Sequence, residues 1–163
     1  DLVRLKSLRV LFASNNRFET MPSVLGRCAN LSMLGFRANG MRVLPPESLP
    51  PKLRWLILTD NKLETLPTEL GRRAELQKLM LAGNRLSSLP AEMAGCSKLE
   101  LLRIAANRFE ALPEWLLSLP RLSWLSYSGN PFCESLEAKA LADTPVPAIP
   151  FTTRMPGRGP SMN

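Results

Sequence analysis

The residues best suited to chemistry in this 163-residue chain are glutamates and asparagines that recur at a regular spacing. Glu19, Glu64 and Glu110 each stand two residues after an arginine or lysine, which indicates solvated charge pairs rather than catalytic acids. The chain has no histidine to activate a serine, and no G-x-x-x-x-G-K-[ST] loop to hold a phosphate. We therefore predict no catalytic residue and no cofactor for this chain.

The three cysteines do not form a metal-binding or disulfide pattern. There is no C-x-x-C pair, and histidine, the commonest nitrogen ligand of zinc, is absent. Cys28 and Cys96 occupy one position of a repeated pattern and are interpreted as small buried apolar residues, whereas Cys133 follows the last copy. We predict no metal site, and free thiols indicate a reducing compartment.

Asparagine recurs once per copy of that pattern. A carboxamide offers two donors and an acceptor, so a buried row of asparagines stacked about 4.8 Å apart can satisfy backbone groups where neighbouring turns lose their ladder partners. A polar ligand site is the alternative, but a site needs one special residue rather than an identical one in every copy. We predict a structural ladder in which Asn130, at the end, has a neighbour on one side only. The row is Asn16, Asn39, Asn61, Asn84, Asn107 and Asn130.

The asparagines lie within a repeat whose leucines follow neither the period of a helix nor that of a strand. Residues 76–90 read LQKLMLAGNRLSSLP, and the first leucines of successive copies fall at positions 8, 31, 53, 76, 99 and 122. A fixed period of this size is typical of a solenoid. Leu79 and Leu81 are two apart and share one face of a short strand. One copy cannot enclose its leucines alone, so stacked neighbours must bury them in a continuous column.

The pattern L-x-x-L-x-L-x-x-N-x-L, present in six copies between Leu8 and Phe132, resembles the leucine-rich repeat. The L-P-x-x-[LM] continuation resembles the intracellular 23-residue class, which includes plant Ras-group proteins and bacterial proteins, some fused to a protein kinase. The resemblance implies an α/β repeat fold: a curved right-handed solenoid with a parallel sheet on the concave face. Short helical or extended turns are expected on the convex face.

The predicted organisation is one repeat domain followed by a cap and a linker. Residues 1–133 comprise a partial repeat (1–7) and the six copies, residues 134–142 a C-terminal cap helix, and residues 143–163 a proline-rich linker or tail. The chain opens in mid-repeat, so we expect a fragment of a longer protein. Each return segment should be one helical turn, with proline at its first position and glycine at its exit. PPESLPPK in copy two holds four prolines and should be extended instead.

The strand positions that face away from the core form two columns with many apolar side chains. Contiguous exposed apolar surface usually marks an interface, and tryptophan and arginine are favoured anchors. Scattered surface apolar residues, or a missing element folded over the sheet, are the alternatives. We predict a protein partner, in cis or trans. The predicted partner-binding residues are Val10, Phe12, Met33, Trp55, Ile57, Lys78, Met80, Leu101, Arg103 and Trp124.

The net charge of +7 raises nucleic acid as a rival partner. A basic row follows the asparagines, but three of its four members have a glutamate two residues on, so we do not favour phosphate-backbone binding. A steep loss of affinity with salt would distinguish it. No apolar run is long enough to span a membrane, and no signal peptide opens the chain. The basic row is Arg17, Lys62, Arg85 and Arg108.

These observations favour a monomeric, cytoplasmic protein-interaction module. The resemblance suggests the recognition arm of a larger signalling protein, such as a bacterial repeat–kinase fusion. The alternative is the substrate-recognition domain of a secreted bacterial effector of the ubiquitin-ligase type. A kinase glycine-rich loop or a ligase cysteine domain after the linker would separate the two.

Overall fold

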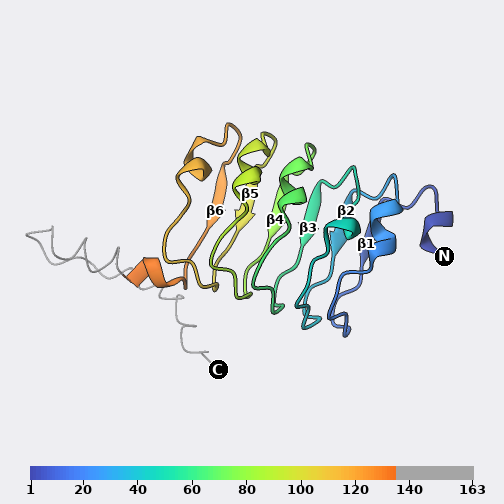
Figure 1. Ribbon diagram of the computed structural model, residues 1–163, viewed down its shortest axis with the longest axis horizontal. Helices are drawn as coiled ribbons and strands as arrows, with labels where there is room; N and C mark the ends of the chain where they lie inside the picture. Colours follow the sequence, from blue (N-terminus) through green and yellow to red (C-terminus); the bar gives the residue numbers. More distant parts are fainter. Residues whose placement is uncertain (135–163) are drawn as a thin grey trace, which may run out of the picture.

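Six strands of three residues each form one parallel sheet, in which the strands lie in the order of the sequence (Figure 1). In the computed structural model, which describes residues 1–134, neighbouring strands pair in register, with Leu34 opposite Leu56 and Leu79 opposite Leu102. The predicted repeat solenoid is therefore confirmed. The strands are β1 (Val10–Phe12), β2 (Met33–Gly35), β3 (Trp55–Ile57), β4 (Lys78–Met80), β5 (Leu101–Arg103) and β6 (Trp124–Ser126).

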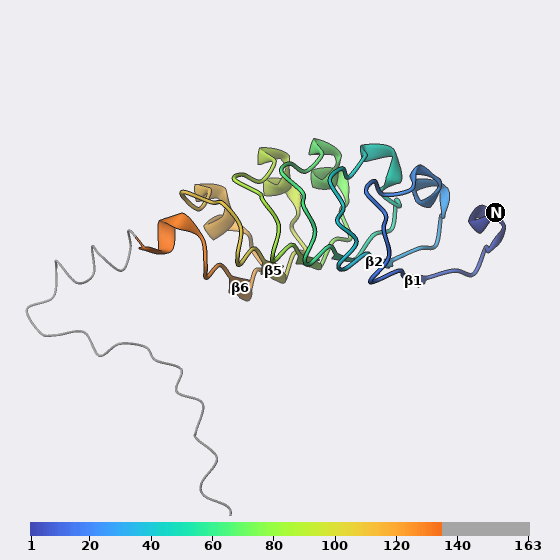
Figure 2. The same ribbon diagram turned by 90° about the horizontal axis from the view of Figure 1, so that it is seen from below.

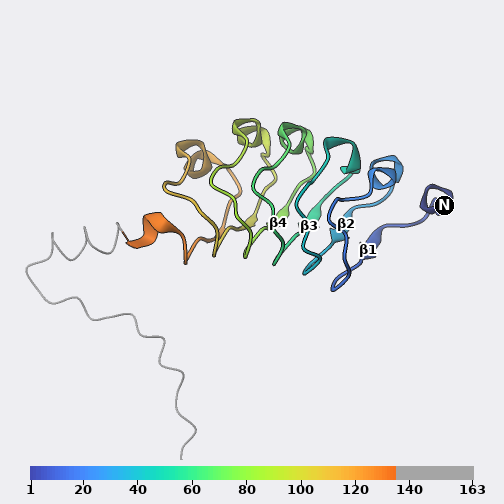
Figure 3. The same cartoon turned by 60° about the horizontal axis from the view of Figure 1, so that its bottom comes forward.

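The chain returns between strands through short 3₁₀ turns on the opposite side of the molecule. The turns fan out along the outer, convex side of the arc, and the strands line the inner, concave side (Figures 2 and 3). This arrangement leaves one face of the sheet open. The turns are η1 (Leu2–Arg4), η2 (Ser23–Arg27), η3 (Pro46–Ser48), η4 (Thr68–Arg72), η5 (Ala91–Gly95) and η6 (Glu114–Ser118).

Copy two forms a turn where an extended return was expected, so that prediction is wrong. Pro46 takes the first position of η3, where its fixed φ suits a helical turn and its missing N–H is no loss. The Ser48 hydroxyl donates to the Pro45 carbonyl at 2.6 Å. A proline also precedes the turn at the N-cap position in η2 to η6, for example Pro45 at η3 and Pro67 at η4, so the proline expected at the first turn position occurs only in η3.

The core is a column of leucines between the sheet and the turns. The middle residue of each of β2 to β5 is fully buried, as are the inward residues of the turns, for example Leu70 and Leu116. Burying one such side chain stabilises the fold by roughly 1.5–3 kcal/mol relative to exposing it. At the first end, Leu5 is 55% exposed, because within residues 1–134 no further turn packs against it.

Two of the three cysteines are buried in this core, and all three are free thiols. Burial raises the pKa of the Cys96 thiol from 9.0 to about 11. Because the unfolded thiol ionises first, this group lowers stability as the pH rises above about 9, and contributes nothing at neutral pH.

The thiols should therefore react with dithionitrobenzoate in two phases at pH 8. Half-buried Cys133 should react first, because the reagent can reach it. Cys96 should react only when the protein unfolds, because burial raises its pKa and the thiolate is the reactive species. Absorbance at the thionitrobenzoate band measures this, and Cys133→Ser should remove the fast phase. Native labelling of Cys96 at the rate of Cys133 would contradict the prediction.

Residues 131–134 begin a helix at the C-terminal end of the described chain. Apart from Glu134, the expected cap helix at 134–142 and the linker at 143–163 lie outside the described residues.

Candidate functional site

The asparagine row is positioned by a repeated left-handed residue. The residue just before each asparagine has a positive φ, between 52° and 73°. Glycine, asparagine and aspartate tolerate this conformation best, and Gly83, Gly129, Asn15 and Asp60 stand at four of the six places. The chain turns here, and the next side chain enters the interior in the last five copies, where it is 3–7% exposed.

Each interior asparagine joins two copies through at least three hydrogen bonds of its side chain. The Asn84 amide nitrogen donates to the carbonyls of Leu58 and Leu81, both at 2.9 Å, and its oxygen accepts from the Leu63 N–H at 3.1 Å. The same reach recurs in the other interior members of the row, which are Asn39, Asn61, Asn107 and Asn130.

The ladder has a direction, because every interior asparagine bonds the copy before it. Asn130 in the last copy therefore also makes three bonds. The exception is Asn16 in copy one, which is exposed and donates only to carbonyls of its own copy. Asn16 therefore does not join the ladder between copies that the sequence predicted for all six asparagines, and the sequence did not indicate the side toward which the row reaches.

The two predicted columns lie on the open face of the sheet. We call this face the concave face. In register, Met33 and Lys78 flank Trp55, and Leu101 pairs with Trp124. Trp124 is 56% exposed, whereas Trp55 and the side chains beside it are half-buried. The concave face comprises Val10, Met33, Trp55, Lys78, Leu101 and Trp124 in one column and Phe12, Gly35, Ile57, Met80, Arg103 and Ser126 in the other.

A cation covers each tryptophan of the concave face. Lys78 Nζ lies 4.0 Å from the centroid of the Trp55 ring, and the Arg103 guanidinium carbon lies 5.4 Å from that of Trp124. Such contacts contribute about 0.5–1 kcal/mol at exposed sites, and they orient the rings. The buried indole nitrogen of Trp55 has no hydrogen-bond partner. Sequence reasoning missed these pairs, although the spacing of one copy between Trp55 and Lys78 was a usable signal.

The first end of the concave face is shaped by a glycine. Phe12 is 55% exposed and lies over the buried Gly35, at which an added Cβ would meet the phenylalanine ring. Val10 beside it is 44% exposed. The apolar surface thus continues from β6 to β1, the first strand.

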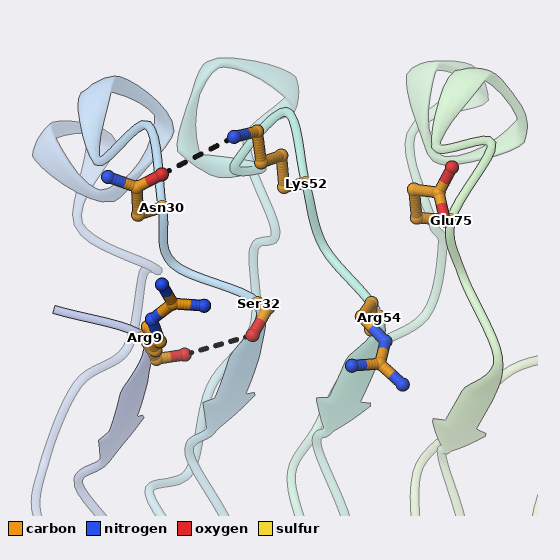
Figure 4. A pocket seen from close by; sticks show the side chains of 6 residues that line it. All are labelled: Arg9, Asn30, Ser32, Lys52, Arg54 and Glu75. Atoms are coloured by element: carbon orange, nitrogen blue, oxygen red, sulfur yellow. Dashed lines mark hydrogen bonds between the residues drawn. The ribbon is translucent and has the colours of Figure 1, made fainter. Parts of the chain in front are cut away.

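A polar depression of about 420 Å³ lies beside this surface, where the chain enters the strands. We call it the strand-start pocket (Figure 4). Sequence reasoning missed it as a site. Its lining residues are Arg9, Asn30, Ser32, Lys52, Arg54 and Glu75.

The other candidate charges do not gather into a site. Glu19, Glu64 and Glu110 are exposed, and the two ion pairs within residues 1–134 are elsewhere, so the expected pairing with their basic neighbours is not found. Within the same residues, no cluster of three or more potential metal ligands occurs. Among the helices of the described chain, none combines the length and apolarity needed to span a bilayer.

Comparisons with known proteins agree with this geometry. A family model described as "Leucine rich repeat" matches residues 51–109 and 74–132. An LRR protein of Leptospira interrogans is 31% identical with a TM-score of 0.62, and the match covers 79% of this chain and 39% of that one. The plant peptide hormone receptor RGFR1, solved in complex with RGF2, is 31% identical with a TM-score of 0.69, over 79% of this chain and 22% of that one. A search of curated proteins found no significant match.

Proposed function

Because the chain belongs to the leucine-rich repeat family, a fold typical of protein-interaction modules, we propose that it binds a protein partner on its concave face. The observation that carries the proposal is the position of the apolar side chains. Trp55, Ile57, Met80 and Leu101 project from the face of the sheet that the core does not use. These four side chains are half-buried, and the exposed Val10, Phe12 and Trp124 extend the same apolar surface, which is the kind of surface that marks binding sites in soluble proteins.

The spacing of the two tryptophans suggests the size of the bound element. Trp55 and Trp124 lie in the same column, on β3 and β6, which at about 4.8 Å per strand places them roughly 14 Å apart. A single helix or extended segment laid across the strands spans that distance. The cations Lys78 and Arg103 over the rings favour an acidic rim on the partner.

The wider role proposed is recognition within a larger, cytoplasmic signalling protein, for example a repeat–kinase fusion, with this part monomeric. The recognition domain of a secreted effector of the ubiquitin-ligase type is the alternative. The chain spans 39% and 22% of the two similar structures, so in both a repeat array of this kind is part of a longer chain. The similar plant receptor was solved in complex with RGF2.

Site-specific photo-crosslinking tests which face meets the partner. A benzoylphenylalanine placed at Met80 on the concave face should capture a partner from native extract. The matched control replaces Leu117, which is 79% exposed on the convex side. We expect a discrete adduct from position 80 and none from position 117. An adduct that forms only from position 117 would place the partner on the convex side.

A further inference from the structure

The strand-start pocket gathers three cations from three successive copies. Arg9 precedes β1, and Lys52 and Arg54 lead into β3, so segments far apart in sequence bring them to one depression (Figure 4). Only one acidic side chain, Glu75, lines the same depression.

The positive charge of the pocket is not compensated by the protein. Both carboxylate oxygens of Glu75 accept from Lys98 Nζ, at 3.0 and 2.9 Å, so this acid is already occupied. Within residues 1–134, none of the three pocket cations takes part in an ion pair. A pocket that holds three cations and one neutralised acid carries a net positive potential, which attracts anions.

Neutral side chains in and beside the pocket hold two of the cations and leave donors free. Lys52 Nζ donates to the Asn30 side-chain oxygen at 3.3 Å, and Arg54 donates one of its N–H groups to Gln77 at 3.0 Å. An arginine has five N–H donors and a lysine three, so most of them remain available. Planar guanidinium groups suit the paired oxygens of a carboxylate or phosphate. The chemistry of the lining therefore fits an oxyanion.

The pocket and the concave face are adjacent along the chain. Arg9 is followed by Val10 and Arg54 by Trp55, so each arginine stands one residue before a member of the apolar column. A partner segment with apolar side chains on that column would bring its neighbouring groups to the pocket.

We propose that the strand-start pocket binds an oxyanion, a carboxylate or a phosphate, carried by the protein segment that lies on the concave face. This inference rests on the proposed function, and it adds the chemical class that the partner must present. An acidic or phosphorylated residue beside an apolar stretch meets that requirement.

The pocket can be tested with small anions alone. We would titrate inorganic phosphate and, separately, acetate at low ionic strength, and follow the arginine Nε–H signals by NMR. Binding should be saturable, and at least tenfold weaker for Arg9→Gln with Arg54→Gln. The matched control, Arg85→Gln with Arg108→Gln, removes the same charge from the basic row and should change affinity less than twofold. A clear preference for phosphate would identify a phosphorylated segment as the source, and similar affinities a carboxylate.

Two results would contradict the proposal that the pocket binds an oxyanion. One is the absence of saturable binding, and the other is equal weakening by the two double variants, which would show diffuse attraction by the net charge.

Failure of the pocket can be told apart from failure of the concave site. Trp55→Ala and Trp124→Ala should leave the phosphate titration unchanged, because neither side chain lines the pocket. If these variants no longer bind the partner while phosphate does not bind the native protein, the oxyanion proposal is wrong and the proposed function stands. If phosphate binds but the variants keep the partner, the concave site is wrong, and the anion cannot be assigned to a segment on that face.

Discussion

Replacing Asn84 with alanine should lower the free energy of unfolding by about 1–3 kcal/mol, the desolvation cost of leaving a buried polar group unsatisfied. The side chain is 7% exposed and makes three hydrogen bonds, two of which join its copy to the one before. Alanine offers no donor or acceptor, so the Leu63 N–H and the carbonyls of Leu58 and Leu81 lose these bonds. Urea melts followed by tryptophan fluorescence measure the effect.

The direction of the ladder supplies the controls. Asn16→Ala should change stability by less than about 0.5 kcal/mol, because this side chain is exposed and bonds only its own copy. Asn130→Ala should deprotect the Phe109 amide, which donates to the Asn130 oxygen, in hydrogen exchange. Equal melting of the Asn84 and Asn16 variants would mean that the amides do not hold neighbouring copies together.

Replacing Trp124 or Trp55 with alanine should weaken partner binding by 2 kcal/mol or more, which is about thirtyfold in affinity. Both rings lie on the face of the sheet that the core leaves open, and each is held by a cation that fixes its orientation. Rigid, partly exposed aromatic side chains of this kind are typical binding hot spots. Titration of the captured partner against each variant gives the affinity.

Stability should change little in the same variants, which separates binding from folding. Trp124 is 56% exposed, so its removal should cost little beyond its contact with Arg103, which is worth about 0.5–1 kcal/mol. Trp55 also loses its contact with Lys78, which is worth about 0.5–1 kcal/mol. If Trp55→Ala unfolds the protein, the side chain belongs to the core, and the assignment of faces is wrong.

The repeat spacing was enough to predict the sheet and its core. Because one copy repeats every 22 or 23 residues, aligned positions must stack, and the register of Leu34 on Leu56 and Leu79 on Leu102 follows from the alignment. The same alignment placed the asparagines in one row and the tryptophans in one column. The alternation of core and open-face residues along a strand then separated Leu56 from Trp55.

The sequence did not predict the direction of the asparagine bonds, the turn in copy two or the strand-start pocket. The asparagines reach back to the preceding copy because the chain turns at a left-handed residue, which Gly83 and Gly129 signalled but Ala106 did not. The turn in copy two formed because Pro46 opens it, whereas counting prolines predicted an extended segment. The strand-start pocket is lined by the residues on either side of the first leucine of a copy, so the alignment stacks these positions, but their residue types vary from copy to copy and no consensus residue marks the pocket.

The central claim is that the concave face binds the partner. The most direct measurement is isothermal titration of the captured partner into the native protein, the Trp55→Ala/Trp124→Ala double variant and Leu117→Ala. Leu117 is a matched apolar control, 79% exposed on the convex side. We expect the double variant to lose at least about thirtyfold in affinity and the Leu117 variant to bind normally. Normal binding by a folded double variant, or a loss confined to Leu117→Ala, would contradict the claim.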